Sequence, residues 1–73
     1  MLELLRTNDL VLLSAVESLL TAADIPHHVL DGHMSALEGS LGFLPRRLIV
    51  PEEDGLRARR LLTEAGFSNV LVS

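Results

Sequence analysis

Cysteine is absent from this sequence of 73 residues, which excludes disulfides, zinc–thiolate sites, iron–sulfur clusters and thiol nucleophiles. Tyrosine and tryptophan are also absent, so only two phenylalanines are available to stack against bases. Lysine is missing too: six arginines face ten acidic residues, and the net charge is −4. Proteins that bind nucleic acid usually carry a basic stripe that neutralises phosphates. The composition therefore argues against nucleic acid as a partner.

Long hydrophobic runs are absent as well. The N-terminus reads "MLELLRTND", with charges inside the first six residues, and lacks the apolar region of a secretory signal. No apolar stretch approaches the roughly 20 residues that a membrane-spanning helix needs. We expect a cytoplasmic protein with no membrane partner, folded as one domain over residues 1–73. The hydrophobic content of 48% is high for so small a domain, which indicates that a partner covers some apolar surface.

The spacing of apolar and polar residues predicts four strands and two helices. Residues 1–7 alternate as a half-buried strand does, and Asn8 or Asp9 can cap the helix that follows. A second helix follows Pro51 and three acids, because carboxylates favour the positive end of a helix, and it ends at Gly66. The predicted elements are a strand at 1–7, a helix at 10–23, strands at 25–31 and 46–50, a helix at 55–65 and a strand at 68–73.

This β-α-β-β-α-β order, in a chain without linkers, predicts the α+β class and the ferredoxin-like split βαβ sandwich. In that fold a four-stranded antiparallel sheet has the spatial order 4-1-3-2, and both helices cover one face. Alternation then assigns the faces of the sheet. The residues expected to face the helices are Leu2, Leu4, Leu48, Val50, Val70 and Val72. The residues expected on the opposite face are Glu3, Leu5, Thr7, Arg47, Ile49 and Leu71.

That opposite face is a candidate surface for self-association. Leu5, Ile49 and Leu71 lie on neighbouring strands of the predicted sheet and would form one apolar patch. Contiguous apolar patches on an uncovered sheet mark interaction sites. A homo-oligomer formed through this face is therefore one expectation.

Neither the histidines nor the serines form a recognisable catalytic or metal site. His27 and His28 are neighbours on a predicted strand and point to opposite faces, so they cannot close on one ion. The candidate nucleophiles Ser35 and Ser40 have no spacing typical of a nucleophile elbow or a catalytic triad. The segment "GSLG" lacks the G-K-[ST] of a phosphate-binding loop. We expect no catalytic residue, no metal and no cofactor.

The stretch "HMSALEGSLGFLPRRLIV", residues 33–50, is the part that is hardest to interpret as plain scaffold. It contains most of a connection at 31–45, which is long, because strands are usually joined by roughly 2–5 residues. The connection keeps apolar residues that a solvated turn would not need: Met34, Leu37, Leu41, Phe43 and Leu44. These residues must either pack on the body of the domain or await a partner.

Three arginines are expected at the base of this loop. In the predicted fold Arg6, Arg46 and Arg47 lie beside the N-terminus of the first helix, which favours anions. The alternative is that these arginines pair with Asp9, Asp31 or Glu38 and only pin the loop. Strand alternation sends Arg46 and Arg47 to opposite faces, so at most one of them joins Arg6. The candidate residues for binding a ligand or partner are Arg6, Glu38, Gly39, Ser40, Gly42, Arg46 and Arg47.

Nearly the whole chain resembles a small bacterial family of unknown function, catalogued as putative prokaryotic signal-transducing proteins. The segments that carry the resemblance are "NDLVLLSAVESLL", "ADIPHHV", "HMSALEGSLGFLPRR", "LIVPEED" and "ARRLLTEAGF". Two positions depart from it: Leu10, where such sequences often have proline, and Asp24, where glycine often precedes Ile-Pro. The family is similar in fold to the nitrogen-regulatory PII-like proteins, which signal through the loop between strands 2 and 3. The resemblance implies such a role for 31–45 and implies no catalytic residue.

The sequence thus predicts a non-enzymatic regulatory module that binds a partner protein or a small anionic ligand through the loop between strands 2 and 3. The alternative is a purely structural oligomeric domain or accessory subunit with no ligand. The ligand hypothesis requires Arg6 and Arg46 to be exposed and unpaired, whereas the structural alternative expects them to be tied to acids.

Overall fold

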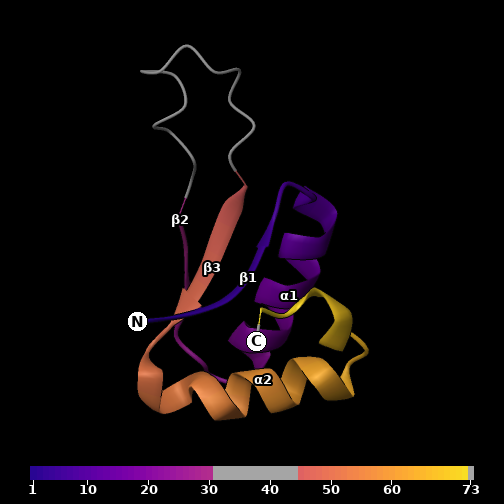
Figure 1. Cartoon of the computed structure of the whole chain (residues 1–73). Helices are drawn as coiled ribbons and strands as arrows, with labels where there is room; N and C mark the ends of the chain where they lie inside the picture. Colours follow the sequence, from indigo (N-terminus) through magenta and orange to yellow (C-terminus); the bar gives the residue numbers. More distant parts are fainter. Residues whose placement is uncertain (31–44, 73) are drawn as a thin grey trace.

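The computed structural model describes residues 1–30 and 45–72 of the chain. The Glu38, Gly39, Ser40 and Gly42 positions proposed for binding lie outside these residues. Figure 1 shows the strands side by side, with α1 next to β1 and α2 across one end of the sheet. The elements are β1 at Leu2–Thr7, α1 at Leu10–Ala22, β2 at His28–Leu30, β3 at Arg46–Val50 and α2 at Gly55–Glu64, with short 3₁₀ helices at Glu52–Asp54 and Ser68–Val70.

Helix α1 begins where its first turn is capped by a side chain. The Asp9 carboxylate accepts hydrogen bonds from the backbone N–H groups of Val11 (3.0 Å) and Leu12 (3.1 Å), which have no partner inside the helix. The Thr7 hydroxyl in turn accepts from the backbone N–H of Asp9 at 3.0 Å. Of the two candidate caps in the sequence, Asp9 is therefore the one that caps α1.

The two helices end in the same way, and the chain repeats the sequence that ends them. Residues 19–25 read "LLTAADI" and residues 61–67 read "LLTEAGF". In each copy two backbone N–H groups beyond the helix reach back to its last turn, which is the Schellman arrangement. The left-handed residue that this motif needs is Asp24 (φ 58°) in one copy and Gly66 (φ 95°) in the other. The four bonds are Asp24 N to Thr21 O (3.1 Å), Ile25 N to Leu20 O (2.9 Å), Gly66 N to Thr63 O (3.1 Å) and Phe67 N to Leu62 O (2.9 Å).

Within residues 1–30 and 45–72 the sheet contains three strands in the order β1-β3-β2, with both pairs antiparallel. The predicted four-stranded sheet in the order 4-1-3-2 is therefore wrong. Beside β1, the described part of the C-terminal segment forms a single bridge between Leu5 and Leu71, and Val72 N donates to Leu4 O at 2.8 Å.

The strand predicted at 68–73 does not extend over this range because its first half forms a 3₁₀ helix. Ser68 and Asn69 are turn-forming residues, and they begin the 3₁₀ helix that ends at Val70. Only Leu71 and Val72 then remain beside β1 in the described chain. Arg59 of α2 donates to the Val72 carbonyl at 2.6 Å, which ties the segment to the helix layer.

Strand β1 contains a bulge that reverses its alternation. Glu3 pairs with Ile49, but the next pair is Leu5 with Leu48, so Leu4 is an extra residue. Leu4 and Leu5 are both fully buried. Beyond the bulge, every residue of β1 lies on the face opposite to the one that strict alternation predicts. The assignments of Leu5 and Thr7 to the face away from the helices are wrong, and so is the apolar patch that included Leu5.

Cross-strand partners share a face, so the observed register defines both faces of the sheet. The covered face, which packs against the helices, contains Leu2, Leu5, Thr7, Val29, Arg46, Leu48 and Val50. In the described part of the chain the open face contains two rows of three residues each, namely Glu3, Ile49 and His28, then Arg6, Arg47 and Leu30.

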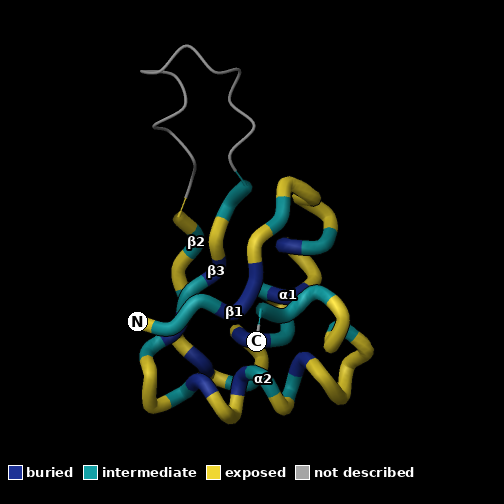
Figure 2. The backbone as a smooth tube through the Cα atoms, viewed as in Figure 1, coloured by how far each residue is buried: buried dark blue, intermediate teal, exposed yellow. Residues whose placement is uncertain are grey.

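The hydrophobic core lies between the covered face and the two helices. Buried positions recur among exposed ones along both helices (Figure 2). The buried core residues are Leu4, Leu5, Leu48 and Val50 from the sheet, Leu13, Val16 and Leu20 from α1, Ile25 after it, and Ala58 and Leu62 from α2. One core therefore joins both helices to one side of the sheet. Among the described helices, none is both long and apolar enough to cross a membrane.

Candidate functional site

The three arginines proposed at the base of the loop do not lie on one face. Arg6 and Arg47 are cross-strand partners on the open face. Arg46 instead pairs with Thr7 on the covered face. Without the bulge, alternation would bring Arg46 to the face of Arg6. The bulge exchanges the two, so Arg47 joins Arg6 and Arg46 does not.

Arg6 is exposed and carries its own counter-ion. Its Nε donates to the Glu3 carboxylate, three residues earlier on the same face, while 58% of the Arg6 side chain remains exposed. The hydrogen bond that Arg6 donates to Glu3, and then the negative charge of Glu3, raise the pKa of Arg6 above the ordinary value for arginine. The ligand hypothesis required an unpaired Arg6, and Arg6 is paired with Glu3.

Arg47 has a different environment. It is exposed, and within residues 1–30 and 45–72 no acid forms an ion pair with it. Its neighbours across the two strand pairs are Arg6 on one side and Leu30 on the other. Among the described residues, the open face thus holds two arginines paired across the strands and one carboxylate, that of Glu3.

The anion-binding capacity of the α1 N-terminus is already used. The N–H groups of Val11 and Leu12 bind the Asp9 carboxylate, which is itself the anion that a helix N-terminus favours. A second anion there would meet the charge of Asp9. The helix terminus is therefore not the part of the predicted anion site that would take a further anion.

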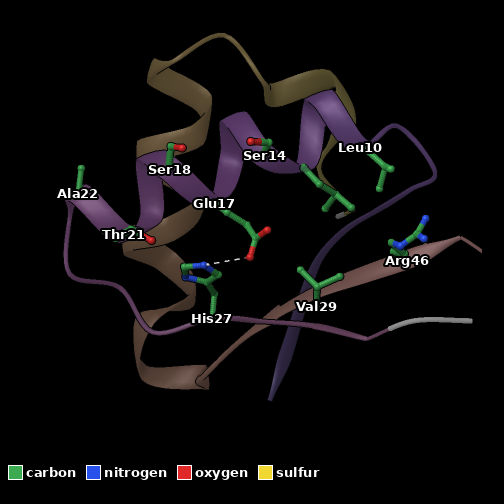
Figure 3. Close-up of a pocket in the computed structure, with 10 residues that line it drawn as sticks. Leu10, Ser14, Glu17, Ser18, Thr21, Ala22, His27, Val29 and Arg46 are labelled. Atoms are coloured by element: carbon green, nitrogen blue, oxygen red, sulfur yellow. Dashed lines mark ion pairs between the residues drawn. The ribbon is translucent and has the colours of Figure 1, made fainter.

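A groove lies on the other side of the sheet, between α1 and the strands β2 and β3. It has a volume of about 690 Å³. Figure 3 shows Arg46 near Leu10 at one end of α1 and His27 with Glu17 further along the helix. The lining residues are Leu10, Leu13, Ser14, Glu17, Ser18, Thr21 and Ala22 of α1, with His27, Val29 and Arg46.

Sequence reasoning missed this groove, although one signal for it was present. Ser14, Glu17, Ser18 and Thr21 form the polar stripe of α1 and would ordinarily be assigned to solvent. In the structure all four line the groove. The stripe could have been recognised as one wall of a groove only if the distance between α1 and β2 had been known.

His27 and Glu17 form an ion pair inside the groove. His27 Nε2 lies 3.4 Å from Glu17 Oε2, and its Nδ1 lies 3.0 Å from the carbonyl oxygen of Ile25. The His27 side chain is 14% exposed and that of Glu17 is 42% exposed. The contact joins α1 to the segment that leads into β2. Within the described chain, no three histidine, aspartate or glutamate side chains lie close enough to hold a metal ion.

Residues 1–66 match the model of a protein family described as "putative prokaryotic signal transducing protein". The match runs from β1 through Gly66, the left-handed residue that ends α2, and so includes the whole sheet and both helices. The chain belongs to this family. The family resemblance predicted from the sequence is thereby confirmed, and the description points to a role in signal transduction. Among curated proteins, none matches the chain.

Proposed function

We propose that the protein is a non-enzymatic signal-transducing module that binds an acidic surface of a partner protein through the open face of its sheet. The observation that carries this proposal is the pairing of Arg6 with Arg47 directly across two strands. Like charges in that position destabilise a sheet. An acidic partner would convert this repulsion into two attractive contacts.

The chemistry of Arg47 supports an acidic partner. A guanidinium group presents several donors in a plane and matches the two oxygens of a carboxylate. Arg47 is exposed and has no counter-ion among the described residues, whereas Glu3 already neutralises Arg6. One further carboxylate on the partner would restore charge balance on this part of the open face.

The shape of the open face favours a protein surface over a small ligand. Sites for small molecules are concave, and the groove found in the described chain lies on the opposite side of the sheet. Leu30, 39% exposed, and the half-buried Ile49 adjoin Arg47 and offer apolar contact. Arginine is enriched at protein interfaces, where apolar contacts are surrounded by a polar rim.

The location is also consistent with the loop hypothesis. Leu30 immediately precedes, and Arg47 closely follows, the connection at 31–45 that the resemblance to PII-like proteins marks as a signalling loop. A partner on this end of the open face would lie next to both ends of that connection. The proposal therefore keeps binding near the connection at 31–45 and makes Arg47 the residue that recognises the partner.

A charge reversal at Arg47 tests the proposal. The probe is a fluorescent peptide of six glutamates, whose binding is followed by anisotropy in low salt. We expect the Arg47→Glu variant to bind it at least about tenfold more weakly, a loss of about 1.4 kcal/mol. Arg60→Glu, at an exposed arginine of α2, makes the same change in net charge and should alter binding less than about twofold.

Equal losses in the two variants would show that only net charge matters and would overturn the proposal. Inorganic phosphate serves as a second probe, monitored by amide chemical shifts. If phosphate shifts the Arg47 amide at concentrations where the peptide does not bind, a small anion is the ligand and the partner-protein assignment fails.

A further inference from the structure

The open face carries a titratable side chain that the proposed function does not use. His28 of β2 is exposed, and its pairing with Ile49 places it on the same face as Arg47. Arg47 stands two residues before Ile49 on β3, so it is a diagonal neighbour of His28 across the strand pair. Diagonal neighbours in a sheet lie about 7–8 Å apart, within reach of long side chains. His28 therefore adjoins the arginine to which the proposed function assigns recognition.

His27, the preceding residue in the chain, lies on the other side of the sheet. Its ring points into the groove, where Nε2 is 3.4 Å from Oε2 of Glu17 on α1 (Figure 3). Successive side chains of an extended chain point to opposite faces, so His28 is turned away from this contact. The two neighbouring histidines thus have different surroundings and can be compared by substitution.

The surroundings of His28 contain no acid that pairs with it. Within residues 1–30 and 45–72, no carboxylate forms an ion pair with His28. Glu3 shares its row on the open face but stands beyond Ile49 and is held by Arg6. Protonation of His28 would therefore add a cation beside Arg47 without forming an ion pair to a described carboxylate.

Three further charged groups lie near the ends of these strands. Glu52 and Glu53 follow β3, and the amino group of Met1 precedes β1. Carboxylates ordinarily keep their charge between pH 6 and 8, and the Met1 amino group is the same in every variant compared below. A difference in pH dependence between two variants therefore reports on the substituted residue.

The chemistry of histidine makes this position sensitive to pH. Histidine is the side chain whose charge ordinarily changes between pH 5 and 8. A neutral imidazole at position 28 leaves recognition to arginine, whereas an imidazolium adds a cation that donates from both ring nitrogens. An acidic surface binds the charged form more tightly, and by linkage its binding favours uptake of a proton. One ion pair at about 4 Å in water corresponds to about fivefold in affinity.

We propose that His28 is a further recognition residue of the open face and makes the binding of an acidic partner depend on pH. The inference rests on the proposed function, because it concerns the same face and the same class of partner. Binding is weaker at pH 8, where Arg47 recognises the partner without His28. It is tighter at pH 6, where the imidazolium of His28 pairs with a second carboxylate of the partner.

The six-glutamate peptide tests this assignment with the full 73-residue chain. We expect the wild type to bind at least about threefold more tightly at pH 6 than at pH 8. His28→Gln should bind equally at both pH values, with the affinity of the wild type at pH 8. His27→Gln and His33→Gln, which replace the other two histidines, should keep the pH dependence of the wild type. A pH dependence that persists in His28→Gln, or that disappears in either control, would overturn the inference.

A permanent charge at the same position provides the converse test. His28→Lys carries a cation at both pH values, so at pH 8 it should bind the peptide about as tightly as the wild type does at pH 6. Thr63→Lys adds the same charge at an exposed position of α2 and should change the affinity less than about twofold. Equal gains in the two lysine variants would mean that net charge alone sets the affinity, and the role of His28 would be wrong.

Proton uptake distinguishes a direct role of His28 from an indirect one. Calorimetry at about pH 7, in two buffers with different ionisation enthalpies, measures the protons that the complex takes up when the peptide binds. The wild type should take up a fraction of one proton and His28→Gln close to none. The same uptake in both proteins would place the titrating group elsewhere and contradict the inference.

The two assignments on this face fail in different ways. If Arg47→Glu weakens binding at pH 8 but the affinity of the wild type does not change with pH, the proposed function stands and the role of His28 is wrong. If Arg47→Glu binds as tightly as the wild type at both pH values, or if the wild type does not bind the peptide at about 1 mM at pH 6, both assignments are wrong.

Discussion

Arg6 lies directly opposite Arg47 across the antiparallel pair of β1 and β3, and the Glu3 carboxylate is held by Arg6 beside them. Two guanidinium groups at this position repel each other. The ion pair with Glu3 reduces that repulsion but leaves one positive charge in excess among these three residues. The sheet therefore has an unfavourable pair on its open face that individual changes can relieve or worsen.

Neutralising Arg47 should raise the stability of the isolated protein. Because the net charge is already −4, loss of an arginine would ordinarily be unfavourable. We expect Arg47→Gln nevertheless to raise the thermal midpoint, with a gain that shrinks as salt rises from 10 mM to 500 mM, since salt screens exposed charges. Glu3→Gln is the matched control and should lower the midpoint. A midpoint that falls for both variants would mean that Arg47 is not repelled by Arg6.

The bulge in β1 predicts a large difference between two residues that strict alternation places on the same face. Leu5 is fully buried, whereas Ile49 is only half-buried. We expect Leu5→Ala to cost about 2–5 kcal/mol of unfolding free energy, the range for deleting a buried leucine side chain. Ile49→Ala should cost clearly less. Urea denaturation of both variants measures the difference, and similar costs would argue against the bulge.

The repeated helix ends provide a matched pair of substitutions. Asp24 adopts a left-handed conformation that costs an L-residue about 1–2 kcal/mol, while Gly66 adopts it without that cost. We expect Asp24→Gly to stabilise the protein by about 0.5–1 kcal/mol after the greater entropy of unfolded glycine is subtracted. Gly66→Ala should destabilise it by about 1 kcal/mol or more. Thermal unfolding of the two variants would contradict this account if both shifted in the same direction.

The cap of α1 can be separated from its charge. Asp9→Ala leaves the N–H groups of Val11 and Leu12 without their acceptor and should cost about 1 kcal/mol. Asp9→Asn keeps an acceptor oxygen and loses only the charge, so it should cost about 0.3–1 kcal/mol at low salt and less at high salt. Chemical denaturation at two salt concentrations distinguishes these effects. An alanine variant as stable as the wild type would show that α1 does not depend on this cap.

The helices were predictable because their signals are local. The cap at Asp9, the polar stripe of α1 and the stop at Gly66 each depend on residues within one or two turns of one another. The candidate site was less predictable. The sequence identified Arg6 and Arg47 as candidates. It did not show which arginine shares a face with Arg6, because that depends on the bulge at Leu4. The only local trace of the bulge is that two leucines, Leu4 and Leu5, stand next to each other in β1.

The sequence by itself determined the composition, the charge, the order of helices and strands up to β3 and α2, and membership of a family through residues 1–66. Only the tertiary structure decided that the described part of the fourth strand is reduced to one bridge, that Arg46 and Arg47 lie on different faces, and that α1 and β2 enclose a groove. The physical reason is the range of the interactions. Helix caps and turns are formed between near neighbours in the chain, whereas a bulge, a sheet edge and a groove exist only once distant segments are paired in a particular register.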